Sequence, residues 1–404
     1  MVEDDHMRAK DRPHGCHFRQ RNRSCYLPPI LPRHNRQRTC VPRFMNMAEN
    51  AWSKLLKSLS DIDDPVKLAS FNVLSATYKV SENCKIRADL LLGKSIVESA
   101  GGFPQKIPLI VRIHGGYLVG GATLYAPWLS DWILELAERE GAAILMPNYR
   151  LLPESNGFDI LEDMDDFWRW TRHGGASKLL SEAFPNLDID TSRTLVIGES
   201  AGGYLAMQLT LSHPRDIHGL ICCYPMLEVE SDFYNTASEK TIAGVPNLDP
   251  RLLEDHLVQI RSSATVPTEA YPPDRLALSF VVVQTGRFLE FLTRGKERYE
   301  VEAYERLFPL RRLQNERDAD GEARGANLPP MFIFHGEQDS AVPCGGTNLF
   351  EERLRAFRSA ARLRVSLQSG DHGFDARAST ETPWLKQGLH EVVNGWLRSG
   401  TSNL

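Results

Sequence analysis

The chain has 404 residues, a formal net charge of −5 at pH 7, 42% apolar residues and 25% charged residues. These proportions are those of an ordinary globular protein, and the length allows one large domain or two to three smaller ones. The negative charge gives no electrostatic reason to expect nucleic acid as a partner, and no apolar run reaches the roughly 18 residues of a membrane span. Seven irregularly spaced cysteines without a secretory signal favour reduced thiols in a cytoplasmic protein.

Residues 1–46 differ from the rest in composition. They contain nine Arg, four His and three Cys and have no helical or strand periodicity. We expect a disordered Arg-rich tail or a mis-assigned start, for which Met45 or Met47 is a natural alternative. A transit peptide is disfavoured by the acidic residues of the segment, and a zinc site is disfavoured because no Cys-x₂-Cys pair occurs. The zinc ligands would be Cys16, His17, Cys25 and Cys40.

The first periodic segment follows this tail. Apolar residues from Trp52 to Leu59 recur at i, i+3, i+4 and i+7, which predicts an amphipathic helix that ends near Asp61. Its polar face carries only two basic residues, so packing on the protein itself is favoured over a position at a membrane surface. Residues 85–92 then predict a strand.

A buried strand at 109–113 runs directly into His114-Gly115-Gly116-Tyr117. Glycines at the end of a strand place backbone amides beside a loop that a ligand can reach. The elements predicted downstream of this loop are a helix at 129–139, a strand at 142–147 and a helix at 160–172.

The central motif is Gly198-x-Ser200-x-Gly202, which lies between an apolar strand at 194–197 and a helix that starts at Ala201. A strand that turns abruptly into a helix strains the middle residue, and a side chain at either flanking glycine would clash. The turn therefore predicts that the Ser200 hydroxyl is lifted clear of the sheet. It also leaves the amide of Ala201 free to donate to an anion.

The alternation of strands and helices stops over residues 228–328, which are rich in Pro, Glu and Arg. This insertion contains an apolar stretch at 276–283, and its polar part at 315–327 predicts a loose loop. Alternation on both sides of it predicts one domain over 47–404, with a mostly parallel central sheet and helices on both faces. The elements predicted around the insertion are strands at 220–223, 331–335 and 363–367 and helices at 348–361 and 384–398.

A serine nucleophile needs a base within hydrogen-bond reach and a carboxylate that holds the base. Asp339 and His372 each follow a predicted strand, so both are expected at the same sheet edge as Ser200. Glu337 and Asp371 compete with Asp339 for the role of the carboxylate. Asp339 is favoured by its loop position, because Asp371 is adjacent to the base and would point elsewhere.

The chain resembles the hormone-sensitive-lipase-like branch of the α/β-hydrolases, which includes many carboxylesterases. The resemblance spans about residues 109–398 and implies the α/β-hydrolase fold, with a helical cap from about 47–75 and 228–328. It rests on four motifs in the family's order, namely His114-Gly115-Gly116, Tyr149-Arg150-Leu151-Leu152-Pro153-Glu154, Gly198-Glu199-Ser200-Ala201-Gly202-Gly203 and His372-Gly373-Phe374.

The resemblance also implies the roles of the site residues. Ser200 would be the nucleophile, His372 the general base and acid, and Asp339 the orienting carboxylate. The triad chemistry needs neither a metal nor a cofactor. The oxyanion hole would be formed by Gly115, Gly116, Tyr117 and Ala201.

Two residues depart from the family's pattern. Tyr117 stands where a third glycine is usual, and Tyr204 replaces the usual asparagine. The amide of Tyr117 can still donate, but its ring would narrow the acyl pocket or stack on a substrate. Both changes, with the large insertion, suggest an unusual substrate. Arg150 and Glu154 are expected to pair and brace their loop.

These features favour a carboxylesterase-like serine hydrolase that cleaves an ester, lactone or thioester of a hydrophobic small molecule. The chain also resembles fungal enzymes of secondary metabolism. One alternative is acyl transfer, dehydration or cyclisation of a natural product on the same scaffold. A non-catalytic binder is disfavoured because receptor relatives lack the histidine that His372 provides. The expected partner is the substrate, without nucleic acid or stable membrane insertion, and a homodimer is an option that the sequence leaves open.

Overall fold

The computed structural model describes residues 43–62, 66–81, 84–261, 265–314, 328–358 and 361–398. The expectations for residues 1–42, including the zinc ligands considered there, and for the loop at 315–327 lie outside these ranges. Helix α1 (Arg43–Ile62) begins earlier than its predicted core, so residues 43–46 are helical rather than part of a tail. The reason is that the helical spacing of apolar residues continues upstream through Phe44, Met47 and Ala48.

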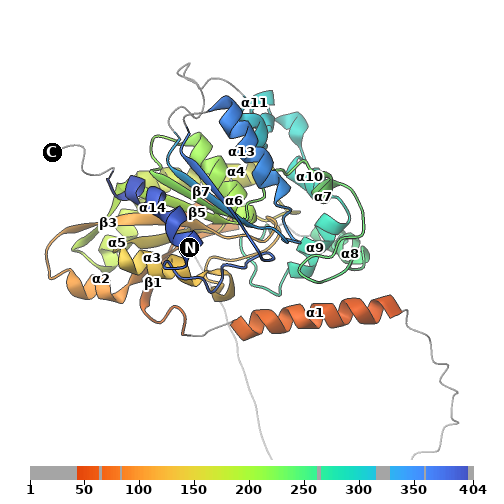
Figure 1. The fold of residues 1–404 in the computed structure, drawn as a ribbon, viewed down its shortest axis with the longest axis horizontal. Helices are drawn as coiled ribbons and strands as arrows, with labels where there is room; N and C mark the ends of the chain where they lie inside the picture. Colours follow the sequence, from red (N-terminus) through yellow and green to blue (C-terminus); the bar gives the residue numbers. More distant parts are fainter. Residues whose placement is uncertain are drawn as a thin grey trace, which may run out of the picture. The chain divides into compact units, whose positions relative to one another are not determined.

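Eight strands form one mixed, mostly parallel sheet (Figure 1). Their order is β1-β2-β4-β3-β5-β6-β7-β8, in which β2 pairs antiparallel with β1 and β4 and the remaining pairs are parallel. This confirms the predicted fold class. The strands are β1 (Phe71–Ser81), β2 (Cys84–Gly93), β3 (Gln105–Ile113), β4 (Ala143–Pro147), β5 (Leu187–Glu199), β6 (Gly219–Cys223), β7 (Met331–Gly336) and β8 (Leu363–Gln368).

Helices flank the sheet and fill the insertion between β6 and β7. They are α2 (Lys94–Ser99), α3 (Asp131–Arg139), α4 (Gly157–Arg172), α5 (Gly175–Ala183), α6 (Ala201–Ser212), α7 (Asp232–Asn235), α8 (Arg251–Ile260), α9 (Leu276–Gln284), α10 (Phe288–Leu292), α11 (Val301–Glu305), α12 (Pro309–Arg312), α13 (Gly345–Phe357) and α14 (Pro383–Arg398), with 3₁₀ turns η1 (Ala126–Trp128) and η2 (Lys296–Arg298).

Two layers of apolar side chains cover the two faces of the sheet. Along β3, Leu109 and Val111 belong to one layer and Ile110 to the other, as the alternation of side chains along a strand requires. Helices α4, α5, α6 and α13 contribute to the layer of Leu109, whereas α3 and α14 contribute to the layer of Ile110. The prediction of helices on both faces is therefore confirmed.

The insertion folds as short helices, of which α7 to α10 are grouped beside the sheet (Figure 1). We call α1 and the segment α7–α12 the cap. Helix α9 is apolar on all sides and buried, and Trp52 of α1 packs edge-on against its Phe280 at a centroid distance of 6.0 Å. Helix α1 therefore packs on the protein itself, as predicted. The cap does not extend to residue 75, because residues 71–75 alternate in burial as the start of strand β1.

Within the described ranges, no single helix combines the length and apolar character of a membrane span. One bent pair, α9 with residues 288–298, meets the requirement on length and composition alone, and its α9 half is buried inside the protein.

Candidate active site

Ser200 occupies a strained turn between β5 and α6. Its backbone has φ 58° and ψ −121°, a region that residues other than glycine rarely adopt. A Cβ atom at Gly198 would lie 2.2 Å from the Gly202 carbonyl oxygen, and one at Gly202 would lie 2.0 Å from the Ile113 carbonyl oxygen. Only glycine fits either position, so the two glycines let β5 turn into α6 directly at Ser200.

The close approach of Gly202 to the Ile113 carbonyl oxygen predicts the effect of a substitution at Gly202. Gly202→Ala should lower the free energy of unfolding by about 3 kcal/mol, because backbone must move to admit the methyl group. Gly345→Ala is the matched control, since a Cβ at this helical position meets nothing within 4 Å. It should change stability by less than about 0.5 kcal/mol. Urea unfolding of both variants checks this, and equal stabilities would contradict the steric argument.

The loops after β7 and β8 bring Asp339 and His372 together. His372 Nδ1 lies 2.7 Å from Asp339 Oδ2, and the Asp339 side chain is fully buried. Of the competing acids, Glu337 is exposed. Asp371 accepts hydrogen bonds from Ser340 and from the backbone amide of His372. Asp339 is therefore the carboxylate that faces the imidazole.

Several donors hold the Asp339 carboxylate. Oδ1 accepts from the amides of Ala341 at 2.9 Å and Val342 at 2.8 Å, and His335 Nε2 lies 3.3 Å from Oδ2. Burial by itself would raise the pKa of Asp339. The charge of His372 and the hydrogen bonds from His335, His372 and Val342 outweigh burial and hold this pKa well below its usual range. The carboxylate is thus ionised and fixed in orientation.

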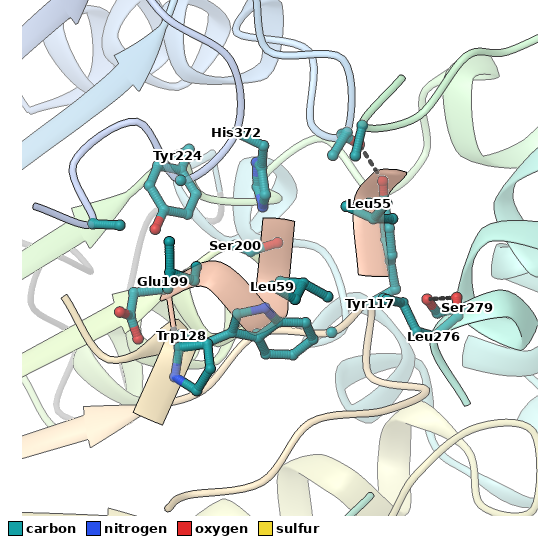
Figure 2. A pocket seen from close by; sticks show the side chains of 18 of the residues that line it. Leu55, Leu59, Tyr117, Trp128, Glu199, Ser200, Tyr224, Leu276, Ser279 and His372 are labelled. Carbon is teal, nitrogen blue, oxygen red and sulfur yellow. Dashed lines mark hydrogen bonds between the residues drawn. The ribbon is translucent and has the colours of Figure 1, made fainter. Parts of the chain in front are cut away.

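Ser200 and His372 line the same cavity. Figure 2 shows the nitrogen-bearing edge of the His372 ring directed toward the Ser200 side chain. The Tyr224 ring packs edge-on against the imidazole at a centroid distance of 4.4 Å, which limits its movement away from the serine. Ser200 and His372 thus share one cavity at the carboxyl edge of the sheet, and Asp339 contacts His372 beside it.

The loop after β3 lies against the serine. A Cβ atom at Gly115 would be 2.9 Å from Ser200 Cβ, and Gly116 and Tyr117 have φ of 110° and 55°. None of the described groups accepts a hydrogen bond from the amides of Gly116, Tyr117 or Ala201. These three amides are therefore available to an oxyanion formed at Ser200.

The side chain of His114 supports the glycine loop that follows β3. Its ring stacks on Tyr149 at a centroid distance of 4.5 Å, and the Tyr149 hydroxyl donates to the His114 carbonyl at 2.9 Å. Burial lowers the pKa of His114 to about 3, so the ring is neutral at physiological pH. An uncharged, stacked imidazole braces the loop without competing with the free amides for an anion.

The two unusual tyrosines have structural partners. The Tyr117 hydroxyl donates to the Ala341 carbonyl, which ties the glycine loop to the loop of Asp339, and its ring lines the cavity. The Tyr204 hydroxyl donates to the Leu307 carbonyl at 3.0 Å and so anchors the cap to α6. Tyr204 therefore faces the cap backbone and does not line the cavity, so any effect on the substrate would act through the cap.

The expected pair between Arg150 and Glu154 is wrong. Arg150 turns toward α4, where its Nε lies 2.9 Å from Asp163. Glu154 turns toward the cap, where Arg275 Nη2 lies 2.7 Å from its carboxylate and His256 Nε2 lies 3.0 Å away. The two side chains leave the loop in different directions, so each braces a different neighbour.

A cavity of about 260 Å³ surrounds Ser200. Figure 2 shows Leu55 and Leu276 of the cap on one side of Ser200 and Glu199 and Tyr224 on the other. Arg112 also lies on this second side, where it forms a buried ion pair with Glu199. This ion pair was not predicted from the sequence. The sequence feature that could have indicated this pair is a single arginine inside an apolar strand, because a buried arginine requires a buried partner.

In the described part of the chain, no group of three or more His, Cys, Asp or Glu side chains is placed to hold a metal ion.

Known proteins with similar sequences point in the same direction as the geometry. The model of the alpha/beta hydrolase fold family matches residues 110–283. A probable carboxylesterase, M8, from Phoma sp. is 30% identical over 336 residues, which cover 82% of this chain and 98% of that protein. The probable carboxylesterase clz11 from Cochliobolus lunatus is 29% identical over 209 residues, covering 50% of this chain and 86% of that protein.

A third relative is much longer. The non-reducing polyketide synthase ascC from Acremonium egyptiacum is 28% identical over 341 residues, which cover 80% of this chain but 15% of that protein. The similarity is therefore confined to a small part of the synthase.

Solved structures share the fold. Esterase B from Lactobacillus Rhamnosis has a TM-score of 0.53 at 15% identity, covering 89% of this chain and 95% of that chain. A fungal esterase from Rhizomucor miehei has a TM-score of 0.53 at 18% identity, covering 89% and 96%. These structures show the fold, and the Phoma relative together with the family model shows the family. The chain belongs to the hormone-sensitive-lipase-like α/β-hydrolases and is a carboxylesterase-like hydrolase.

Proposed function

We propose that this protein cleaves carboxylic esters of hydrophobic small molecules through Ser200 as nucleophile, His372 as general base and acid, and Asp339 as the orienting carboxylate. The observation that carries the proposal is the convergence of Ser200 and His372 on one cavity, with Asp339 Oδ2 2.7 Å from His372 Nδ1. Because Nδ1 faces Asp339, the other ring nitrogen, Nε2, is left for proton exchange with the serine.

In the proposed acylation, Ser200 Oγ forms a bond to the ester carbonyl carbon as its proton passes to His372 Nε2. The negative charge moves to the carbonyl oxygen, which the amides of Gly116, Tyr117 and Ala201 stabilise. Each such donor typically contributes about 10²- to 10³-fold in rate. Collapse breaks the bond to the leaving alkoxide, which takes the proton from His372. A water molecule activated by His372 then releases the acid by the same steps.

The bond that the protein cleaves is proposed to be an ester, a lactone or a thioester. The apolar cap side chains Leu55, Leu59, Leu276 and Phe280 support a hydrophobic substrate, because they line the cavity. Two relatives bear the name probable carboxylesterase, and both are fungal. A role in secondary metabolism is supported by the likeness to part of a polyketide synthase.

That likeness also favours a second candidate function. An acyl group on a serine can pass to an acceptor other than water when another nucleophile is bound beside it. In that case the acyl group on Ser200 would be transferred to a hydroxyl, amine or carbon nucleophile bound in the cavity, as acyl transfer or cyclisation.

A serine-directed fluorophosphonate should bind covalently to Ser200, because the free amides around it favour the phosphonate oxyanion. Intact-mass measurement and peptide mapping check the adduct. The matched control is Ser279, a second serine that lines the cavity and whose hydroxyl donates to the Leu276 carbonyl at 2.7 Å, so its peptide should stay unmodified. A protein that gains no mass at Ser200 would instead be a non-catalytic binder.

Oxygen-18 labelling separates the two candidate reactions. In ¹⁸O-enriched water, hydrolysis of a p-nitrophenyl ester places one heavy oxygen in the acid product. Acyl transfer or cyclisation leaves the product without it, and mass spectrometry of the product decides between them.

A further inference from the structure

One lobe of the cavity ends at a buried ion pair. Arg112 and Glu199 line it together with Ser130 and Tyr224, and the side chains of the pair are 0% and 5% exposed. Arg112 Nε lies 2.6 Å from Glu199 Oε2, and its Nη2 lies 2.5 Å from the same oxygen. Arg112 also donates to the carbonyls of Thr123 and Trp128. Every nitrogen of the guanidinium therefore has an acceptor.

The second carboxylate oxygen of Glu199 has no partner. Oε1 is buried, and no described group donates a hydrogen bond to it. A buried polar atom left unpaired costs free energy, and native proteins contain few of them without a functional reason. Glu199 lines the cavity and directly precedes Ser200. Its unpaired oxygen is therefore a candidate partner for a polar group of a ligand bound at the serine.

Ser130 adds a second acceptor to the lobe. The Ser130 hydroxyl donates to Asp375 Oδ2 at 3.0 Å, so it can only accept from a ligand. Each guanidinium nitrogen of Arg112 already has an acceptor, whereas Glu199 Oε1 is an acceptor without a donor. A complementary ligand group must therefore be a hydrogen-bond donor.

The walls of the lobe are aromatic, since Trp128 and Tyr224 both line it. We propose that this lobe is a subsite for a hydroxyl group carried by an aromatic substrate. The hydroxyl donates to Glu199 Oε1, and the ring packs against Trp128 and Tyr224. The inference rests on the proposed function and deepens it, because it names hydroxylated aromatic esters as the substrate class.

Matched esters test the subsite in the unaltered protein. The acyl series consists of 4-nitrophenyl phenylacetates with a hydroxyl or a methoxy group at ring position 2, 3 or 4, because the methylene insulates the carbonyl from the substituent. Hydroxyphenyl and methoxyphenyl acetates test the leaving-group side. Burial raises the pKa of Glu199 to about 7 although Arg112 opposes the shift, so assays at pH 8 keep the carboxylate ionised.

At one ring position, kcat/KM should favour the hydroxyl over the methoxy ester by about 10- to 100-fold, as expected for a hydrogen bond to a buried charged group. In Glu199→Gln, the amide oxygen must face Arg112, which leaves an N–H₂ donor toward the lobe. The hydroxyl-to-methoxy ratio should then fall to about one or below. Ser279→Ala, on the cap side of the cavity, should keep the wild-type ratio.

A binding measurement covers the case in which Glu199→Gln does not fold. Calorimetric titration of wild-type protein with the N-methyl amides of the same acids needs no turnover, and the hydroxylated amide should bind about tenfold more tightly. Wild-type protein that hydrolyses or binds both members of every pair within threefold of each other would overturn the subsite, which then holds water alone. Selective binding without hydrolysis of any ester would retain the subsite and overturn the hydrolase proposal.

Discussion

Ser200→Ala should lower kcat/KM for p-nitrophenyl esters by about 10⁴-fold or more, to the residual rate that an oxyanion site and binding alone sustain. The loss is large because the Ser200 hydroxyl is the nucleophile of the proposed acylation and the His372 ring is directed toward it. The measurement is initial-rate hydrolysis of p-nitrophenyl esters of increasing acyl length, with a lactone and a thioester in the same series.

Two features of this assay make it decisive. Ser181→Ala, on the outer helix α5, is the control and should keep wild-type activity, since its hydroxyl only donates to the Lys178 carbonyl. The cavity of about 260 Å³ is near the lower limit of ordinary ligand pockets, so activity should decline for long acyl chains. An alanine variant that keeps a tenth of the wild-type rate would remove Ser200 from the mechanism.

The parallel half of the sheet was predictable because its strands contain short apolar runs that are followed by a helix or a glycine turn. Strands β4, β6, β7 and β8 lie within one residue of their predicted bounds, whereas β3 and β5 begin earlier than predicted, at Gln105 and Leu187. The loops of Asp339 and His372 follow from the strand order. The strand register then brings these loops to one edge. The local sequence pattern was sufficient here because a buried parallel strand is recognisable as a nearly continuous run of apolar residues.

The rest of the fold depends on contacts between distant residues. Strand β1 alternates between half-buried and exposed positions, a weak pattern that reads equally well as part of a cap. Arg112 and Glu199 are 87 residues apart, and Arg275 reaches Glu154 across 121 residues. No local spacing encodes such partners. The sequence therefore predicted the residues at the cavity's centre but not the ion pair at its end or the ties that hold the cap.

Asp339→Asn should lower kcat/KM by about 10³- to 10⁴-fold while leaving Ser200 in place. The carboxylate fixes the His372 tautomer, since Oδ2 lies 2.7 Å from Nδ1. An amide can donate to Nδ1 and stabilise the tautomer whose Nε2 carries the proton, which cannot accept one from serine. Ester hydrolysis by the variant checks the loss. Glu337→Gln, two residues earlier and exposed, should leave the rate unchanged.

The same substitution has a consequence for stability whose sign follows from the lowered pKa of Asp339. A carboxyl group with a depressed pKa in the folded state stabilises the protein above its unfolded pKa of about 3.9, and this contribution is lost as the pH falls through the folded value. Wild-type protein should therefore unfold at higher urea than Asp339→Asn at pH 7, and the gap should narrow below about pH 4. A gap that is constant from pH 7 to pH 3 would mean that the donors around Asp339 do not favour its ionised form, and the orienting role of this carboxylate would lose its electrostatic basis.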